Sequence, residues 1–359
     1  MAISTLIVDD TVTYRKILSE AAASFPELSV AGTAPNGGIA LKKMAQTPVQ
    51  LVLLDIHMPG MDGVETLEHI RHDFPGAFVV MVSGISTRGA DTTIRALQLG
   101  ALDFIRKPEG ASPEENFKHL VDDLRPLVRL VETRIKMVAA GGGATSRPVA
   151  PALPKVKLPE KKQSVVPTRF GVIALGVSTG GPEALTRLLP CLPADLPLPV
   201  VLVQHMPPLF TKSLADSLAK KSALKVVEAA EGEPLCRGTV YIAPGGRHMI
   251  VRQGSDGPAV GLNDGPPENS CRPSVDVLFR SVASAFGSQG ILAVVLTGMG
   301  SDGCAGVRAC KRASCLCITQ NEQSCVVYGM PRAVDEAGLS DLSLPLDDIA
   351  GEIVRRVRW

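Results

Sequence analysis

Short apolar segments alternate with amphipathic segments along the first 125 residues. Five of the apolar segments are predicted strands: Thr5–Val8, Leu28–Ala34, Val49–Leu54, Phe78–Val82 and Asp103–Ile105. They lack strict alternation of apolar and polar residues, which is typical of parallel strands buried on both faces. Helical spacing lies between them, for example over Val12–Ala23 and Gly89–Leu99. Five strand–helix units predict a doubly wound, five-stranded α/β sheet.

A second α/β pattern covers residues 169–359. Its predicted strands are Phe170–Val177, Val200–Gln204, Val226–Glu228, Thr239–Ala243, Ile291–Thr297 and Leu316–Thr319. A closing helix is predicted over Leu346–Val357, with arginines at its carboxyl end, where cations suit the helix dipole. The fold class is therefore α/β, with two doubly wound, mostly parallel-sheet domains.

The two patterns are separated by a segment of different composition. A last helix of the first pattern is predicted over roughly Pro113–Val138, and three consecutive glycines and several prolines among lysines follow it. Glycine-rich chains are flexible and proline-rich chains are extended, so this composition indicates a linker. We divide the chain into a first domain at 1–125, a linker at 126–168 and a second domain at 169–359.

Composition narrows the class of protein. The chain has 359 residues, 45% of them hydrophobic, which is enough for two cores. Its net charge of +1 and its 4% aromatic content argue against nucleic-acid binding. The eight cysteines show no C-x-x-C spacing, so we expect small buried side chains rather than disulfides or a metal site. No signal-peptide pattern or bilayer-length apolar run is present, so we expect a cytoplasmic protein that is not membrane-embedded, and a monomer by default.

Polar side chains follow four of the predicted strands in the first half. Asp9 and Asp10 follow the first strand, Asp55 the third, Ser83 the fourth and Lys107 the fifth. In a doubly wound sheet these positions share one edge, where ligands bind. Three carboxylates there would repel one another without a divalent cation, and their oxygen atoms suit Mg²⁺. Asp55 is then a candidate nucleophile toward a phosphoryl donor, whose oxygens Lys107 and Ser83 would hold.

Each of these residues also has an ordinary structural explanation. Asp10 suits the cap of the following helix, Ser83 a loop hydroxyl, and Lys107 a surface cation. Taken singly, those explanations are favoured. The grouping of five such residues at the ends of four strands favours a phosphate-accepting site.

The second half contains a candidate serine nucleophile. Gly176–Gly181 follows a strand, precedes Pro182 and fits G-x-S-x-G around Ser178. Small neighbours in that motif let the serine project from a tight strand-to-helix turn. The alternative is a phosphate-binding glycine loop, although the spacing of neither the dinucleotide motif nor the P-loop is met.

A serine nucleophile needs a base and an orienting carboxylate. His205 ends a strand at the same sheet edge as Ser178, whereas His248 follows a turn and is predicted to point elsewhere, so we choose His205 as general base. Asp302 follows a strongly apolar strand and is the candidate that fixes the imidazole tautomer. A structural histidine and a solvated loop aspartate are the ordinary alternatives. Backbone N–H groups of Thr179 and of the Gly298–Gly300 loop would form the oxyanion hole.

The first half closely resembles the receiver domains of two-component response regulators. The resemblance covers residues 1–125 and rests on Val8-Asp9-Asp10, Leu54–Gly63, Val82-Ser83 and Phe104–Pro108. It implies that a histidine kinase phosphorylates Asp55. It also implies that Asp10, Asp55 and the backbone carbonyl of His57 hold Mg²⁺, with Asp9 assisting, and that Phe104 is an aromatic rotamer switch.

The second half is similar to the catalytic domains of chemotaxis protein-glutamate methylesterases, the CheB family. The resemblance spans about residues 169–356 and rests on Gly176–Gly181, Gln204–Pro207, Ile242–Met249, Arg272–Phe279, Leu296–Gly303 and Tyr328–Pro331. It implies a triad of Ser178, His205 and Asp302, with Met299 at the oxyanion hole and no cofactor in this domain. It also implies hydrolysis of glutamyl methyl esters and deamidation of glutamines on the cytoplasmic part of chemoreceptors.

A catalytic half behind a receiver half raises a hypothesis of control, and leaves two other classes open. We expect the unphosphorylated receiver to cover the Ser178 cleft and to inhibit it. The main alternative is a phosphorylation-controlled adaptor whose second half binds a nucleotide or a partner. A transcription regulator is disfavoured because the second half lacks a basic recognition helix.

Overall fold

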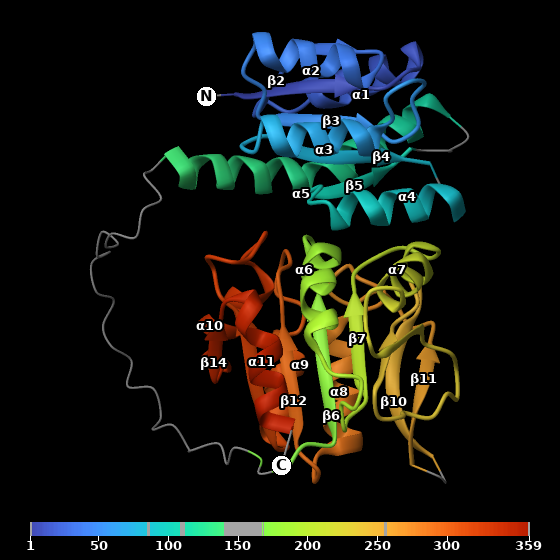
Figure 1. Ribbon diagram of the computed structural model, residues 1–359, viewed down its shortest axis with the longest axis vertical. Coiled ribbons are helices and arrows are strands. Elements are labelled where there is room, and N and C mark those ends of the chain that lie inside the picture. The colour runs from blue at the N-terminus through green and yellow to red at the C-terminus, as the bar shows by residue number, and fades with distance from the viewer. Residues whose placement is uncertain are drawn as a thin grey trace.

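The computed structural model describes residues 2–84, 87–107, 112–139, 167, 169–254 and 257–357. The chain forms two α/β domains stacked one on the other, with helices α4 and α5 of the first domain next to the second (Figure 1). This arrangement confirms the predicted fold class. Among the described residues, none of the helices is both long and apolar enough to cross a bilayer.

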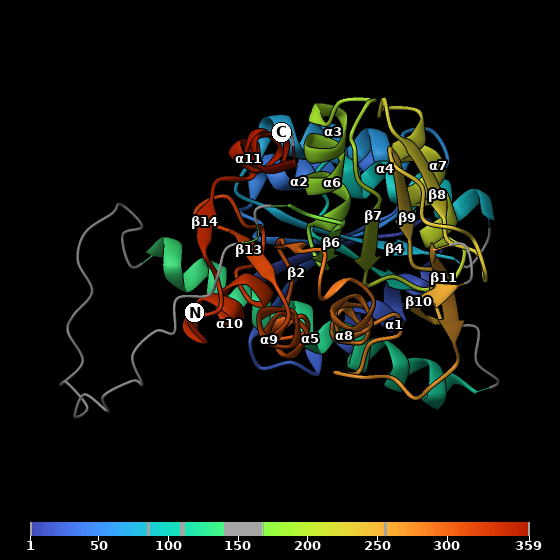
Figure 2. The ribbon, with the colours of Figure 1, turned by 90° about the horizontal axis from the view of Figure 1, so that it is seen from below.

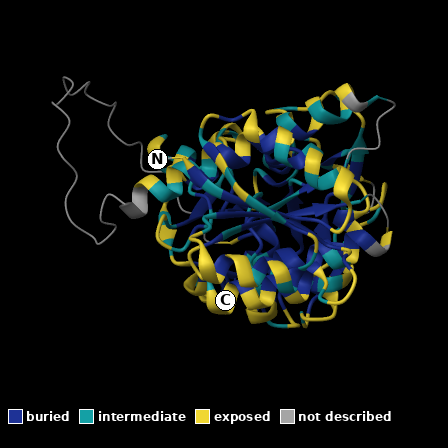
Figure 3. Ribbon diagram, turned by 90° about the horizontal axis from the view of Figure 1, so that it is seen from above, coloured by how far each residue is buried: buried dark blue, intermediate teal, exposed yellow. Residues whose placement is uncertain are grey.

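The first domain is a five-stranded parallel sheet with the order β2-β1-β3-β4-β5. Its strands are β1 (Ile3–Val8), β2 (Leu28–Ala34), β3 (Leu51–Asp55), β4 (Phe78–Ser83) and β5 (Asp103–Arg106). Its helices are α1 (Val12–Ala23), α2 (Gly37–Gln46), α3 (Gly63–Asp73), α4 (Thr87–Gln98) and α5 (Pro113–Ala139). Leu6 and Val8 of β1 pack with α2, α3 and α4, while Ile3 and Ile7 pack with α1 and α5. Burial on both faces explains why these strands do not alternate. Seen from above, the central strands are buried and most exposed residues lie on the outer helices and loops (Figure 3).

Helix α5 corrects the predicted start of the linker. The helix continues through Pro126 to Ala139, so residues 126–139 are helical. Leu127, Val128 and Val131 are buried in the core of the first domain. Their burial outweighs the loss of one helical hydrogen bond at the proline. The remainder of the predicted linker, residues 140–166 and 168, lies outside the described residues.

The second domain is a seven-stranded parallel sheet with the order β14-β13-β12-β6-β7-β9-β8. Its strands are β6 (Val172–Val177), β7 (Val200–Gln204), β8 (Lys225–Glu228), β9 (Thr239–Ile242), β12 (Ile291–Val295), β13 (Cys315–Gln320) and β14 (Leu342–Leu344). An antiparallel hairpin, β10 (His248–Gly254) and β11 (Gly257–Asn263), lies beside it. Successive strands are added on both sides of β6, so the switch point lies at its carboxyl end.

Helices cover both faces of the second sheet (Figure 2). One face carries α6 (Gly181–Leu188), α7 (Phe210–Ala219) and α11 (Leu346–Val357). The other carries α8 (Val275–Phe286), α9 (Cys304–Arg312) and α10 (Met330–Glu336). A short 3₁₀ turn, Leu189–Cys191, follows α6.

The two domains meet through apolar and polar contacts. Helix α4 packs against α6 and α7, and the Phe104 ring lies 4.5 Å from the Phe210 ring, centroid to centroid. Gln98 Oε1 accepts hydrogen bonds from Ser217 Oγ at 3.0 Å and from Lys221 Nζ at 2.7 Å. The first domain therefore rests on the carboxyl edge of the second sheet.

Candidate active site and phosphate-accepting site

Ser178 stands in a turn that only small neighbours permit. It follows β6 directly, and its N–H donates to the carbonyl of Thr297 on the next loop at 3.0 Å. Gly180 has a φ of 78°, a left-handed conformation that favours glycine. A Cβ at Gly298 would lie 2.8 Å from the Cβ of Ser178. The glycines around the nucleophile therefore let two loops approach each other at the head of the sheet.

A cavity of about 520 Å³ brings the predicted catalytic residues together. Ser178, Thr179, His205 and Met299 all line it. Asp302 lies behind His205, with its Oδ2 atom 2.7 Å from His205 Nε2. The structure thus gathers all five residues that the sequence predicts for this site.

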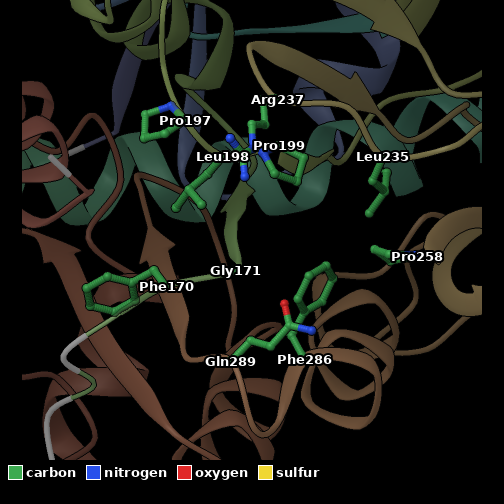
Figure 4. A pocket seen from close by; sticks show the side chains of 10 residues that line it. All are labelled: Phe170, Gly171, Pro197, Leu198, Pro199, Leu235, Arg237, Pro258, Phe286 and Gln289. Atoms are coloured by element: carbon green, nitrogen blue, oxygen red, sulfur yellow. The ribbon is translucent and has the colours of Figure 1, made fainter. Parts of the chain in front are cut away.

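A second cavity, of about 290 Å³, lies at the opposite edge of the sheet (Figure 4). Its walls come from the segments before β6, β7 and β9 and from the end of α8. Its described lining residues include no serine, cysteine, histidine or carboxylate. The lining of the Ser178 cavity, by contrast, includes a serine, a histidine and a cysteine.

The Asp302 carboxylate is held as an anion at the start of α8. Its oxygen atoms accept hydrogen bonds from Ser274 Oγ at 2.9 Å and from the N–H groups of Val275 and Asp276 at 2.7 and 3.0 Å. Burial alone would raise the pKa of Asp302. The hydrogen bond and charge of His205, together with these backbone donors, outweigh burial and hold the pKa well below its ordinary value. Asp302 therefore remains ionised beside the imidazole.

His205 has an unusual protonation preference and a second neighbour. Burial disfavours its charged form, but the hydrogen bond to Asp302 and the charge of that carboxylate outweigh burial and raise the pKa to about 9. In the neutral ring, Nε2 carries the proton toward Asp302, so Nδ1 is the acceptor. Cys271 Sγ lies 3.5 Å from Nδ1. Within the described residues, no hydrogen bond joins Ser178 Oγ to His205.

His248, the other histidine of this half, has a structural role. It is buried, its Nε2 lies 3.0 Å from the Pro266 carbonyl, and its Nδ1 accepts from the Ser274 N–H at 3.2 Å. Both ring nitrogens are therefore engaged. This geometry agrees with the choice of His205 as the histidine at the cavity.

The first domain forms one side of the Ser178 cavity. Its contribution comes from β5 and α5, namely Asp103, Phe104, Arg106, Asp122, Asp123, Pro126 and Leu127. Thr179 Oγ1 donates a hydrogen bond to Asp103 Oδ2 at 2.7 Å. Burial raises the pKa of Asp103, and the bonds from Thr179 and from the Phe104 N–H only partly offset this. The residue after Ser178 is thus bonded directly to the other domain.

The aspartate cluster of the first domain also forms as predicted. Carboxylate oxygens of Asp9, Asp10 and Asp55 lie within 4.8 Å of one another. Lys107 Nζ lies 2.8 Å from both Asp9 Oδ2 and Asp55 Oδ1. Burial raises the pKa of Asp55, against the opposing effect of Lys107.

The cluster is suited to a divalent cation. Among the described residues, the buried Asp55 Oδ2 atom has no hydrogen-bond partner, and hard oxygen donors of this kind are those that Mg²⁺ prefers. The Ser83 hydroxyl, at the end of the neighbouring strand, is buried and accepts from Thr93 Oγ1 at 2.8 Å. His57 follows β3 and is exposed, and the role of its backbone carbonyl stays a prediction.

Sequence reasoning did not find the residues that surround Asp302 and His205. These are Asn269, Cys271, Ser274 and Asp276, on the segment that leads into α8. Ser274 carries a local signal, because it caps α8 and its side chain accepts from the Val277 N–H. The contact of that cap with Asp302 joins segments 28 residues apart and has no local signature.

Comparisons with known proteins agree with this geometry. A family model described as CheB methylesterase matches residues 173–353, and one described as response regulator receiver domain matches residues 5–116. Two relatives are named "Protein-glutamate methylesterase/protein-glutamine glutaminase". The one from Desulfotalea psychrophila is 42% identical over 98% of both chains. The one from Geobacillus kaustophilus is 42% identical over 99% of both.

A solved structure resembles the second domain. The crystal structure of the Thermotoga maritima CheB methylesterase catalytic domain is 40% identical in sequence, with a TM-score of 0.51. It covers 52% of this chain and 99% of its own. The chain belongs to the CheB methylesterase family, with a response regulator receiver domain ahead of the methylesterase domain.

Proposed function

We propose that this protein hydrolyses glutamyl methyl esters on the cytoplasmic part of chemoreceptors, releasing methanol, and deamidates selected glutamines there, releasing ammonia. The names of its relatives support this activity. The observation that carries it is the hydrogen-bonded pair of His205 and Asp302 at the cavity that Ser178 lines. Esters and amides of glutamate both react through one acyl-serine, which explains how one site performs two hydrolyses.

In the proposed mechanism, Ser178 Oγ attacks the carbonyl carbon and forms a tetrahedral intermediate. His205 Nδ1 takes the serine proton and returns it to the leaving methoxide or amine, while Asp302 holds the imidazolium. The N–H groups of Thr179 and Met299 stabilise the oxyanion. Water then attacks the acyl-serine by the same route and leaves glutamate. The Ser178–His205 contact forms on activation, since catalytic hydrogen bonds often tighten only with substrate bound.

We further propose that a chemotaxis histidine kinase phosphorylates Asp55 in the cytoplasm. Asp9, Asp10 and Asp55, with the His57 carbonyl, would hold Mg²⁺, which neutralises charge on the phosphoryl group. Lys107 and Ser83 would bind the phosphoryl oxygens. The proximity of Lys107 Nζ to both Asp9 and Asp55 supports this assignment.

The receiver domain would inhibit the esterase by covering its cavity. The bond from Thr179 to Asp103 and the stacking of Phe104 on Phe210 support this proposal, because both engage edge strand β5. Lys107 follows the same strand directly. Phosphorylation of Asp55 would change the contacts of Lys107 and the rotamer of Phe104. These changes would weaken the contact between the receiver and the second domain.

Methanol release from a methylated chemoreceptor tests the activity. The wild type, Ser178→Ala and His205→Ala would be assayed with and without a small phosphodonor. We expect the phosphodonor to stimulate the wild type, and both variants to lose activity while they remain folded. A serine-directed acylating probe should label the wild type at Ser178 and label His205→Ala far less. Absence of turnover and of labelling in the wild type would favour the adaptor alternative.

A further inference from the structure

Two buried carboxylates meet behind the catalytic histidine. Asp302 contacts His205, and Asp276 lies beside Asp302 on the first turn of α8. The Gly303 N–H donates to both, to Asp276 Oδ1 at 2.9 Å and to Asp302 Oδ1 at 3.1 Å. Neighbouring carboxylates tend to share one proton, as in paired aspartates of acid proteases. Asp302 can hold the His205 imidazolium only while it is ionised. The site must therefore keep Asp276 and Asp302 from sharing a proton.

The side-chain amide of Asn269 joins these two carboxylates. Its Nδ2 atom donates to Asp276 Oδ2 at 3.0 Å and to Asp302 Oδ1 at 2.9 Å. Both acceptors are carboxylate oxygens, so the NH₂ end of the amide must face them. In the described part of the chain, this amide is the one donor to Asp276 Oδ2. Each of its two protons thus satisfies a different carboxylate.

The backbone is strained at Asn269 and at the residue that follows it. Asn269 and Ser270 have φ values of 52° and 62°, in the left-handed region that non-glycine residues seldom adopt. Asn269 is exposed at the cavity, while its amide nitrogen reaches two buried groups. Ser270 shares the strain, but its side chain has no hydrogen bond within the described residues. The strain and the amide contact can therefore be separated by substitution.

We propose that Asn269 is a positioning residue for the hydrolytic reaction, which holds Asp302 toward His205 and keeps Asp302 and Asp276 from sharing a proton. This inference rests on the proposed function of the Ser178 site. The different environments of the two carboxylates support it. The pKa of Asp302 lies below its ordinary value, while burial and the nearby charge of Asp302 raise the pKa of Asp276 against the opposing effects of the Gly306 N–H, the Asn269 amide and Arg280.

Other charged groups face this cluster and must be considered in any pH experiment. Glu268 pairs with Arg280, whose charge acts on both Asp276 and Asp302. Cys271, two residues after Asn269, lies 3.5 Å from His205 Nδ1, and His248 accepts from the Ser274 N–H. Across the cavity, the receiver presents Asp103, Arg106, Asp122 and Asp123. All of these groups are unchanged in the variants below. The effect of their titration on the rate is therefore common to each variant and the wild type.

The first test compares Asn269→Gly with Ser270→Gly in the full chain. Both substitutions relieve left-handed strain, and only the first removes the amide. We expect methanol release from a methylated chemoreceptor, at saturating phosphodonor, to fall about tenfold or more in kcat for Asn269→Gly, since hydrogen bonds to charged groups are strong. We expect Ser270→Gly to remain within about twofold of the wild type. Equal effects of the two variants would overturn the inference.

The second test uses Asn269→Asp, whose new carboxyl can donate only when it is protonated. We expect the ratio of kcat/KM between this variant and the wild type to rise as the pH falls from 8 to 5. A merely structural defect would give a ratio independent of pH, and that result would overturn the inference. Failure of the proposed function would look different, because the wild type itself would then match Ser178→Ala.

Discussion

Replacing Asp302 by asparagine should stop catalysis by reversing the tautomer of His205. Oδ1 of Asp302 accepts from Ser274 Oγ, Asn269 Nδ2 and the N–H groups of Asp276 and Gly303. An amide NH₂ group at that position would face four donors, so the amide oxygen must take it. The NH₂ group then occupies the Oδ2 position, 2.7 Å from His205 Nε2.

The consequence for the imidazole follows from hydrogen-bond polarity. An amide NH₂ group donates to Nε2, which places the ring proton on Nδ1. A protonated Nδ1 cannot accept the Ser178 proton. Loss of the correct tautomer in a serine triad costs about 10⁴ in kcat, so we expect Asp302→Asn to lose about 10³–10⁴ in methanol release.

The same substitution should also destabilise the domain, because it removes the ion pair with His205. The N–H of Val275, now 2.7 Å from Oδ2, would lose its acceptor, which costs about 1–3 kcal/mol. Thermal melting followed by circular dichroism would show whether the variant remains folded at the assay temperature. A folded Asp302→Asn protein that keeps more than a tenth of wild-type kcat would refute the tautomer argument.

Three further outcomes are expected. The folded-state pKa of His205, about 9, exceeds its unfolded value of 6.5, so the ion pair with Asp302 contributes fully to stability below pH 6.5 and is lost as the pH rises through 9. The difference in unfolding free energy between wild type and His205→Gln should therefore shrink over that window in denaturant titrations. Gln98→Ala removes the acceptor for Ser217 and Lys221, and should raise the unphosphorylated esterase rate by about two- to tenfold, with no change once phosphodonor is saturating. Chelation of Mg²⁺ by EDTA, like Asp55→Asn, should abolish stimulation by the phosphodonor and leave the basal rate, and persistence of stimulation in either case would contradict the proposed acceptor site.

The sequence predicts which residues meet at the sheet edges because each of them follows a strand. Ser178, His205 and Asp302 follow β6, β7 and β12, which are neighbours in the sheet. Parallel topology brings the carboxyl ends of such strands to one edge, so their meeting needs no knowledge of loop geometry. The same reasoning places Asp9, Asp55 and Lys107 together in the first domain.

Contacts that depend on how whole elements dock could not be predicted in this way. The start of α8 reaches Asp302 because that helix packs across the sheet, and its residues leave no periodic or spacing signal for that contact. The bond from Thr179 to Asp103 depends on the relative placement of two domains. The helix predicted over roughly Pro113–Val138 forms as α5, Pro113–Ala139, and burial of the turns after Pro126 places these residues in the first domain rather than in the linker predicted from residue 126.

The covered state indicates how much activation must accomplish. His205 and Asp302 are already hydrogen-bonded beneath the receiver, so the proposed activation would not need to form that pair. Under the proposed mechanism, activation would have to form the contact between Ser178 and His205 and open a path for the substrate. The polar and aromatic contacts described above between the domains each contribute about 1 kcal/mol. A complete reversal from 1:99 to 99:1 would need about 5.5 kcal/mol, so loss of one or two of these contacts on phosphorylation should produce a partial shift toward the open form.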